Sequence, residues 1–375
     1  MVERLEKYDE WARACMHVRC GLCRENCPAY SQLRLDSYSA KGKLTMLYHW
    51  LKGSLEPDDI MAERVFACTS CGLCDIACGY EQSTAIQEMK GVLFESDISL
   101  PEGYKQISER TRESGNPYAE NQDAARAFLE SVPELGAEAA DYTLFLGCTE
   151  LYREQEQVSD MLRLLRAAEV SFRVTSENIC CGSPVYRVGD QKQAREQALQ
   201  VTRMLKGDGH RVLASCAGCY RMFSHYYPLI LDEEDTFSVI HSVQLLDQLI
   251  SDGRIAPGPL NAKITYHDPC HLGRHAGIYD EPRRILSAIP GVEMVEMEWN
   301  RKFSKCCGAG GGFRSGRPAD AIAVAVLRVK EAESAGADIL VTACPFCLRN
   351  LSDGAKSIGS SIEVRTIESL LAQQL

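Results

Sequence analysis

Apolar residues between positions 142 and 375 alternate between short continuous runs and faces with helical spacing. Continuous runs indicate buried strands, whereas apolar residues three and four positions apart lie on one face of a helix. The runs are 142–146, 211–215, 264–266 and 338–343. The helical faces are Val158, Met161, Leu162 and Leu165, and then Ala198, Val201 and Leu205. This alternation predicts two β-α-β-α-β units with mainly parallel sheets, each closed by a further short apolar strand and helix at 243–250 and 367–375.

The first 95 residues show helical periodicity. One amphipathic face contains Leu44, Leu47, Tyr48 and Leu51, and a second, shorter one contains Met61 and Val65. The polar stretch 96–141 includes Ser-Gly-Asn-Pro at 114–117, which predicts a linker with one short helix around 124–129. The predicted fold class is α+β and multidomain. It comprises an α-helical module at 1–95, a linker at 96–141, and α/β domains at 142–255 and 256–375.

Charge and hydropathy exclude several classes of function. The chain of 375 residues has 52 acidic and 41 basic side chains, a net charge of −11, and no long basic block. We therefore expect no nucleic-acid partner. The longest nearly apolar stretches, such as 321–327, are far shorter than the roughly 20 residues that span a bilayer, and the polar N-terminus lacks the apolar core of a signal peptide. We expect a cytoplasmic protein.

The 18 cysteines are the outlier of the composition. In a reducing compartment, cysteines are more often metal ligands or catalytic thiols than disulfides. In chain order they form two groups of four and two of five. The groups of four are Cys15, Cys20, Cys23 and Cys27, then Cys68, Cys71, Cys74 and Cys78. The first and second five-cysteine sets are Cys148, Cys180, Cys181, Cys216 and Cys219, then Cys270, Cys306, Cys307, Cys344 and Cys347.

The two five-cysteine sets repeat one pattern. The first reads C-x31-CC-x34-C-x2-C and the second reads C-x35-CC-x36-C-x2-C, and an apolar run precedes corresponding cysteines in both. Such matched spacing indicates an internal duplication. Cys148, Cys216, Cys270 and Cys344 all follow a predicted strand. Because ligands gather beyond the carboxyl ends of parallel strands, the sequence predicts a site at these edges.

The segment from Cys68 to Cys78 has the spacing C-x2-C-x2-C-x3-C of bacterial ferredoxins. In that spacing three thiolates bind one 4Fe–4S cubane and the fourth crosses to the neighbouring cluster. The last part of this spacing, C-x2-C-x3-C, recurs at Cys20, Cys23 and Cys27, with Pro28 after it. The two segments therefore predict a helical two-cluster ferredoxin module. The competing interpretation is a pair of zinc ribbons, but triplets of closely spaced thiols with a trailing cysteine are typical of ferredoxins and are not needed for tetrahedral zinc.

The first of these segments departs from the ferredoxin pattern, since the position three before Cys20 is His17 and the nearest cysteine is Cys15. Three accounts are possible. His17 binds the cluster directly, Cys15 reaches it over a longer loop, or the segment holds a plant-type 2Fe–2S site. The plant-type account leaves Cys27-Pro28 unexplained, and thiolate is the commoner ligand. We predict that each of two sets of four cysteines binds one cubane. The first cubane set is Cys15, Cys20, Cys23 and Cys78. The second cubane set is Cys27, Cys68, Cys71 and Cys74.

Adjacent cysteines such as Cys180 and Cys181 cannot easily face one metal ion, because successive side chains diverge, but they can bind different irons of one cluster. Five thiolates exceed the four corners of a cubane. Each five-cysteine set therefore matches an opened cluster with a bridging thiolate and an iron able to accept an outside sulfur. The alternative is that the C-x2-C pairs at 216–219 and 344–347 are redox dithiols or zinc ligands, and the repetition argues against it.

With Tyr-His-Asp-Pro-Cys-His at 266–271 and Cys-Cys-Gly-Ala-Gly-Gly-Gly at 306–312, this arrangement resembles the cysteine-rich CCG domains of heterodisulfide reductase. With the ferredoxin module in front, nearly the whole chain resembles the D-subunit family of that enzyme, whose relatives include iron–sulfur subunits of glycolate, lactate and anaerobic glycerol-3-phosphate dehydrogenases. The resemblance implies two noncubane 4Fe–4S clusters on the ten cysteines of the five-cysteine sets, which would be the catalytic residues. In the reductase these clusters cleave the disulfide of coenzyme M and coenzyme B in anaerobic methanogenesis.

Two histidines and a glycine-rich stretch have competing interpretations. His267 and His271 flank Cys270, where either is able to supply a proton to a departing thiolate, cap a helix or hydrogen-bond a cluster sulfur. Glycines at 308–312 lack the full dinucleotide-binding pattern, and we expect them to let backbone amides approach a cluster. We expect no flavin or nicotinamide in this chain, so electrons are exchanged with another protein of a redox complex.

Two functions compete. In the first, the five-cysteine sets reduce a small-molecule disulfide with electrons from the N-terminal cubanes. In the second, the chain is a non-catalytic relay between a flavin-binding dehydrogenase and a quinone or membrane partner. The expected partners are a flavoprotein, a membrane cytochrome or a ferredoxin-type donor, with peripheral attachment to the inner face of the cytoplasmic membrane through one of them. Both five-cysteine sets are complete, whereas relay subunits of the family often have a degenerate first set, so the resemblance favours the reductase.

Overall fold

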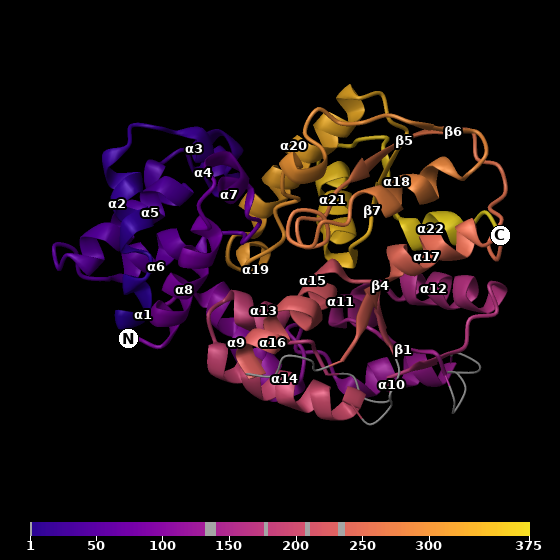
Figure 1. Cartoon of the computed structure of the whole chain (residues 1–375), viewed down its shortest axis with the longest axis horizontal. Coiled ribbons are helices and arrows are strands. Elements are labelled where there is room, and N and C mark those ends of the chain that lie inside the picture. Colours follow the sequence, from indigo (N-terminus) through magenta and orange to yellow (C-terminus); the bar gives the residue numbers. More distant parts are fainter. Residues whose placement is uncertain (1, 132–139, 176–178, 207–210, 232–236) are drawn as a thin grey trace.

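A computed structural model describes residues 2–131, 140–175, 179–206, 211–231 and 237–375. Its three parts are an N-terminal helical domain and two α/β domains that pack against each other and against the helical domain (Figure 1). The α+β multidomain class expected from the sequence is confirmed. In the described residues, no helix has the length and apolar character needed to cross a membrane.

The N-terminal domain is built from short helices around one apolar core. Its elements are α1 (Glu3–Glu6), α2 (Asp9–His17), α3 (Leu22–Asn26), α4 (Pro28–Leu33), the 3₁₀ turn η1 (Asp36–Tyr38), α5 (Ala40–Leu51), α6 (Asp59–Phe66), α7 (Leu73–Cys78) and α8 (Gln82–Phe94). The predicted faces at 44–51 and 61–65 lie in α5 and α6, where Leu44, Leu47 and Val65 are buried in this core. Ser39 and Asp58 cap the N-termini of these two helices, which explains where they begin.

The segment predicted to be a linker contains two helices, not one. The expected short helix is α10 (Gln122–Ser131), and α9 (Glu102–Ser114) precedes it. Helix α9 is mostly polar, but Tyr104, Ile107 and Thr111 recur at helical spacing and are buried against neighbouring domains. Because most residues of the segment are polar, the sequence did not predict a helix from this narrow buried stripe. The end of the predicted linker, 132–139, lies outside the described residues.

The first α/β domain has a four-stranded parallel sheet in the order β2-β1-β3-β4. Its strands are β1 (Tyr142–Phe145), β2 (Phe172–Val174), β3 (Arg211–Ala214) and β4 (Val239–His241). Its helices are α11 (Cys148–Arg153), α12 (Gln155–Ala167), α13 (Ser183–Arg187), α14 (Gln191–Lys206), α15 (Ala217–Arg221), the π-helical turn η2 (Met222–Tyr226), α16 (Tyr227–Leu231) and α17 (Ser242–Ser251).

The second α/β domain repeats this topology with the strand order β6-β5-β7-β8, also parallel. Its strands are β5 (Ala262–His267), β6 (Val292–Met294), β7 (Ile339–Thr342) and β8 (Glu363–Thr366). Its helical elements are α18 (Asp280–Ser287), η3 (Arg301–Phe303), α19 (Phe313–Gly316), α20 (Pro318–Ser334), α21 (Pro345–Ser357) and α22 (Ile367–Ala372). The alternation of strands and helices predicted from the sequence is therefore confirmed.

The last strand of each domain lies earlier than predicted. The segment 243–250 lies inside helix α17, and the segment 367–375 starts with helix α22. Strands β4 and β8 immediately precede these helices. Both strands are at the edge of their sheet and are only partly buried, so their sequences mix apolar and polar residues. A continuous apolar run was the wrong signal for an edge strand.

The two α/β domains contact each other through equivalent elements. Helix α12 packs on α22 and α17 packs on α18, so the same pair of positions is used twice with the domains exchanged (Figure 1). Ser242 also donates a hydrogen bond of 2.5 Å to the Glu368 carboxylate across this boundary. These contacts give the pair a pseudo-twofold arrangement.

One lysine joins all three domains. The Lys90 side chain is completely buried and its Nζ donates to three backbone carbonyls, at 2.8 Å to Cys68, 2.9 Å to Gly311 and 3.4 Å to Arg187. Burial lowers the pKa of Lys90 to about 7. Hydrogen bonds offset part of the cost of burying this ammonium group, so the three loops are held in one arrangement.

Candidate metal centres

The first cubane set is assembled from three segments of the N-terminal domain. Cys15 lies in α2, Cys20 and Cys23 lie in and beside α3, and Cys78 ends α7. Burial and the neighbouring thiols of Cys23, Cys78 and Cys20 raise the pKa of Cys15 to about 11. Mutual electrostatic effects of this kind require the four sulfurs to be close to one another.

His17 is turned away from this group. Its exposed ring packs edge-on against Tyr48, with the ring centroids 5.8 Å apart. The structure therefore brings Cys15, and not His17, together with Cys20, Cys23 and Cys78. The choice of Cys15 over His17 as the ligand stays a prediction, which this arrangement favours.

The second cubane set lines one cavity of the N-terminal domain. Cys27, Cys68, Cys71 and Cys74 surround it together with Pro28 and Leu73. Burial raises the pKa of Cys74, and the charges of Cys71, Cys68 and Cys27 raise it further. Helix α7 carries Cys74 of this set and Cys78 of the first, one turn apart, so the two cubane sets are neighbours.

The second five-cysteine set is continuous through its sulfurs. Cys307 Sγ and Cys347 Sγ lie 3.3 Å apart, and Cys306 is a hydrogen-bonding neighbour of both Cys307 and Cys270. Cys344 contacts Cys347 in the same way. Cys270 and Cys344 follow the two central strands, β5 and β7, so the fold brings them to one edge as predicted.

The first five-cysteine set has the same arrangement. Cys148 Sγ and Cys180 Sγ lie 3.8 Å apart, Cys181 contacts Cys180 and Cys219, and Cys219 contacts Cys216. Hydrogen bonds from Cys180 and Cys219 lower the pKa of Cys181 to about 5. Cys306 and Cys347 likewise lower the pKa of Cys307. These neighbouring thiols thus favour the thiolate form of Cys181 and Cys307.

Two sulfur contacts join these sets across domain boundaries. Cys71 of the second cubane set is a hydrogen-bonding neighbour of Cys306, and both belong to one packed group with Leu73. Cys216 of the first five-cysteine set contacts Cys344 of the second. The cysteines therefore form a line that runs from the first to the second cubane set, then to the second and finally to the first five-cysteine set.

The donor set fits iron–sulfur clusters. All 18 cysteines are free thiols, and each five-cysteine set presents more sulfurs than one tetrahedral ion accepts. The backbone at Gly147 lies close to a cysteine sulfur, because a Cβ on this residue would lie 3.3 Å from Cys219 Sγ. The glycine thus leaves room beside that sulfur, which agrees with a bound cluster. Clusters bound at these sets would be held entirely by thiolates, which is the usual ligation of such groups.

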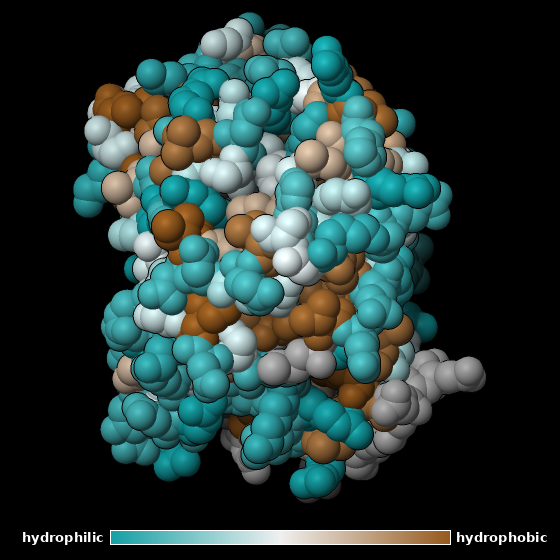
Figure 2. All heavy atoms as spheres, turned by 90° about the vertical axis from the view of Figure 1, so that its left-hand side faces the viewer, coloured by the Kyte–Doolittle hydropathy of each residue, from teal (hydrophilic) through white to brown (hydrophobic). Residues whose placement is uncertain are grey.

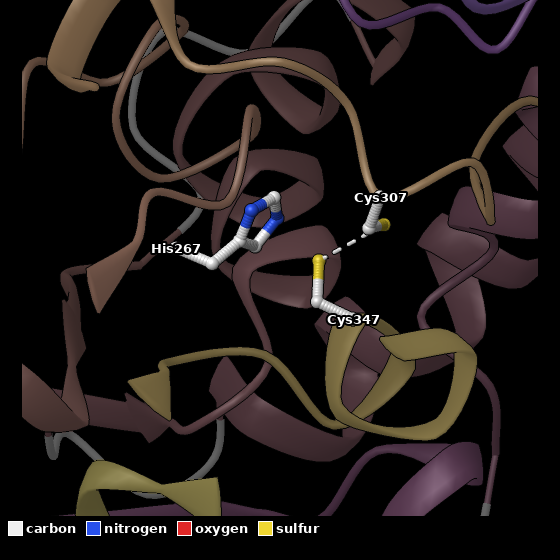
Figure 3. A group of neighbouring side chains, drawn as sticks. All are labelled: His267, Cys307 and Cys347. Atoms are coloured by element: carbon white, nitrogen blue, oxygen red, sulfur yellow. Dashed lines mark hydrogen bonds between the residues drawn. The ribbon is translucent and has the colours of Figure 1, made fainter. Parts of the chain in front are cut away.

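His267 faces the second five-cysteine set. One of its ring nitrogens and the sulfurs of Cys307 and Cys347 all lie within 4.8 Å of one another (Figure 3). Buried Arg328 donates from Nε to His267 Nδ1 at 3.1 Å, so Nδ1 is an acceptor and Nε2 carries the ring proton. His267 Nε2 has no hydrogen-bond partner among the described residues. The Nε2–H group is therefore free to donate a hydrogen bond to a sulfur at this site.

The equivalent position in the first α/β domain is Phe145, which ends β1 as His267 ends β5. A His267→Phe variant copies that arrangement and removes the donor. We expect the reduction potential of the second five-cysteine site to fall by on the order of 50 mV, the one-electron equivalent of about 1 kcal/mol. Redox titration followed by EPR would measure it. An unchanged potential would show that His267 makes no contact with the bound group.

A buried carboxyl group lies where the five-cysteine sets meet. Glu150 accepts hydrogen bonds from the backbone N–H of Gly147 at 2.8 Å and from the hydroxyl of Ser215. Burial, together with smaller effects of Glu368 and Cys344, raises the pKa of Glu150 to about 7, although its two hydrogen bonds oppose this rise. Sequence reasoning missed Glu150 and Arg328, since neither belongs to a motif and both reach the site only through the fold.

The glycine-rich loop at 308–312 lies against a cysteine sulfur, as expected, and against the N-terminal domain as well. The backbone N–H of Gly308 donates to Cys306 Sγ at 3.3 Å. A Cβ on Gly310 would lie 2.6 Å from the Thr69 carbonyl oxygen, and one on Gly311 would clash with the Cys68 carbonyl. The glycines therefore allow close approach to the backbone of the N-terminal domain. The sequence did not predict this second role, the contact between domains.

Comparison with known proteins follows the same division of the chain. A family model for the cysteine-rich (CCG) domain matches residues 142–224 and 264–352, and one for a 4Fe-4S dicluster domain matches 11–81. The D subunit of dihydromethanophenazine:CoB–CoM heterodisulfide reductase from Methanosarcina barkeri is 36% identical over 96% of this chain and 93% of its own. The B subunit of fumarate reductase (CoM/CoB) from Methanothermobacter marburgensis is 29% identical over 98% and 73%.

The fold also resembles a solved structure. A hypothetical protein from Helicobacter pylori superposes with a TM-score of 0.59 over 100% of this chain and 76% of its own, at 9% identity. At that identity the likeness concerns the fold alone.

Proposed function

Because the chain belongs to the D-subunit family of heterodisulfide reductase, we propose that it reduces a small-molecule disulfide at its five-cysteine sets. Family membership makes it an iron–sulfur oxidoreductase component of a redox complex. The proposed substrate is a disulfide of the coenzyme M and coenzyme B type. The proposed cofactors are a 4Fe–4S cubane on each cubane set and a noncubane 4Fe–4S cluster on each five-cysteine set.

The single observation that carries this proposal is the line of sulfurs through the three domains. The line crosses two domain boundaries. A described cysteine lies on each side of both, in the contacts Cys71–Cys306 and Cys216–Cys344. The cysteines of this line would hold iron–sulfur clusters, which would supply one-electron transfer between neighbouring sites. The chain itself supplies their spacing, since rigid helices and strand ends position each cysteine.

We place the point where electrons enter at the first cubane set. Cys20 is exposed, and the apolar side chains of Val18, Leu22, Ile76 and Tyr80 beside this set are exposed as well. Figure 2 shows the side of the molecule to which the N-terminal domain and part of the first α/β domain contribute, where apolar patches interrupt a largely hydrophilic surface. A flavoprotein, membrane cytochrome or ferredoxin-type partner docked there would lie close to Cys20.

The reaction needs two electrons and two protons for each disulfide. The S–S bond breaks, each sulfur gains one electron, and each product thiolate takes up one proton to leave as a thiol. His267 holds a proton at Nε2 beside Cys307 and Cys347, where it is placed to hydrogen-bond a departing thiolate. Arg328 fixes this tautomer by donating to Nδ1.

The test uses the anaerobically purified protein with reduced viologen as electron donor. Adding the mixed disulfide of coenzyme M and coenzyme B should oxidise the viologen, two equivalents for each disulfide. A simple dialkyl disulfide such as diethyl disulfide serves as the control for unspecific thiol exchange. A protein with all its clusters that oxidises no viologen with any disulfide would instead be a relay between redox proteins.

A further inference from the structure

Two buried arginines lie side by side without a carboxylate partner among the described residues. Arg187 ends α13 and is 4% exposed, and Arg221 ends α15 and is 8% exposed. Both guanidinium groups stack on the ring of Tyr226, at 4.7 Å and 5.0 Å from its centroid. Tyr226 is the last residue of the π-helical turn η2, an irregularity found frequently at functional sites.

Most of the nitrogens of these guanidinium groups are unused. Arg187 Nη1 donates to the Tyr226 hydroxyl at 3.2 Å, but Arg187 Nε and Nη2 and Arg221 Nε and Nη1 are buried without a partner among the described residues. Buried N–H groups normally have partners, and a buried charge without a counter-charge is costly. Two like charges this close increase that cost. The arrangement therefore favours an added anion, because no described carboxylate pairs with either arginine.

Two histidines from the other α/β domain complete the cluster. The rings of His271 and His275 have centroids 5.7 Å apart, and Nε2 of each is buried with no partner in the part of the chain that the structure describes. Each neutral ring is able to donate or accept one hydrogen bond at Nε2. The electrostatic influence of both arginines reaches both histidines, so the four side chains occupy one region.

This region adjoins the line of sulfurs. A Cβ placed on Gly218 would lie 3.6 Å from Cys216 Sγ and 3.9 Å from His271 Nδ1. Cys270 is close enough to interact electrostatically with Arg221. The unpartnered donors are therefore beside the point where the two five-cysteine sets meet, which is where a disulfide would react.

We propose that Arg187, Arg221, His271 and His275 form a binding site for an acidic group of the substrate, a sulfonate, carboxylate or phosphate. This inference rests on the proposed function for the identity of the ligand, but not for the existence of the site. Arginine forks match the oxygens of such groups, and fixing one end of a disulfide there orients its sulfurs toward Cys216 and Cys270. Substrates without an acidic group would lose this anchor.

The test measures binding of ethanesulfonate, propionate and ethyl phosphate to the anaerobic holoprotein by calorimetry, with ethanol as the neutral control. None of these probes contains a thiol or disulfide. We expect at least one of the three anions, and not ethanol, to bind. Arg187→Gln and Arg221→Gln should each weaken that binding about tenfold to a hundredfold, because each removes charged hydrogen bonds. Arg163→Gln, which removes an exposed arginine of the same domain, should leave it unchanged.

Iron content and the visible spectrum of each variant establish that it is folded and loaded, and Arg187→Lys replaces Arg187→Gln if the latter fails this check. Wild-type protein that binds none of the anions, or arginine variants that bind them as wild type does, would overturn the site. Variants in which only the cluster spectrum changes would also overturn it, since the guanidinium groups would then serve the cluster. Anion binding that depends on both arginines in a protein that reduces no disulfide would support the site and refute the proposed function.

Discussion

Replacing Cys307 with serine should abolish disulfide reduction while leaving the N-terminal cubanes intact. Cys307 contacts Cys306, Cys347 and His267, so its sulfur lies among three side chains of the second five-cysteine site. Even changes to residues that only support a metal ligand cost about 10–100-fold in affinity or activity. Loss of the thiolate itself should lower viologen-coupled turnover by more than about a hundredfold.

Cys181→Ser is the matched variant in the first α/β domain, because Cys181 occupies the same place in its set. EPR spectra of the reduced variants should retain the cubane signals, since both replaced cysteines lie outside the N-terminal domain. If both sites take part in the reaction, both variants are inactive. Normal turnover in either variant would remove that five-cysteine set from the reaction, and loss of cubane signals would show a general failure to fold.

Replacing Cys15 with serine should remove or convert the cubane of the first set, whereas His17→Ala should leave iron content unchanged. The thiol of Cys15 lies with those of Cys20, Cys23 and Cys78, while the His17 ring packs on Tyr48 at the surface. Serine is a much poorer ligand for iron than thiolate. Iron analysis of the two variants should therefore differ by up to about four atoms per chain.

The two variants are controls for each other, because they lie two positions apart in α2 and are both partly or fully accessible. A destabilised helix would affect both. Iron lost with His17→Ala and kept with Cys15→Ser would mean that the imidazole is the ligand and that the helix rotates when the cluster binds.

Spacing along the chain predicted the groups of cysteines because each group is local. Cys68, Cys71, Cys74 and Cys78 fall within eleven residues, and the pattern states which neighbour crosses to the other cluster. The parallel sheets followed from alternating strands and helices, and this placed Cys148, Cys216, Cys270 and Cys344 at strand ends. The edge strands β4 and β8 were misplaced because exposure on one side breaks up their apolar runs.

Residues that act across domain boundaries left no signal in the sequence. Arg187 and Arg221 are ordinary polar positions at the ends of short helices, and only the fold shows that they are buried together. Lys90 lies in a helix where a lysine is usually exposed, yet it binds carbonyls from three domains. Long-range contacts of this kind have no fixed spacing, so periodicity and motifs do not reveal them.

The central claim is that the 18 cysteines hold four iron–sulfur clusters in one line, and the metal content of the anaerobically purified protein tests it most directly. We predict about sixteen irons per chain, with a matching amount of acid-labile sulfide and no stoichiometric zinc. About eight irons would confine the clusters to the N-terminal domain. Several zinc ions per chain with little iron would contradict the account as a whole.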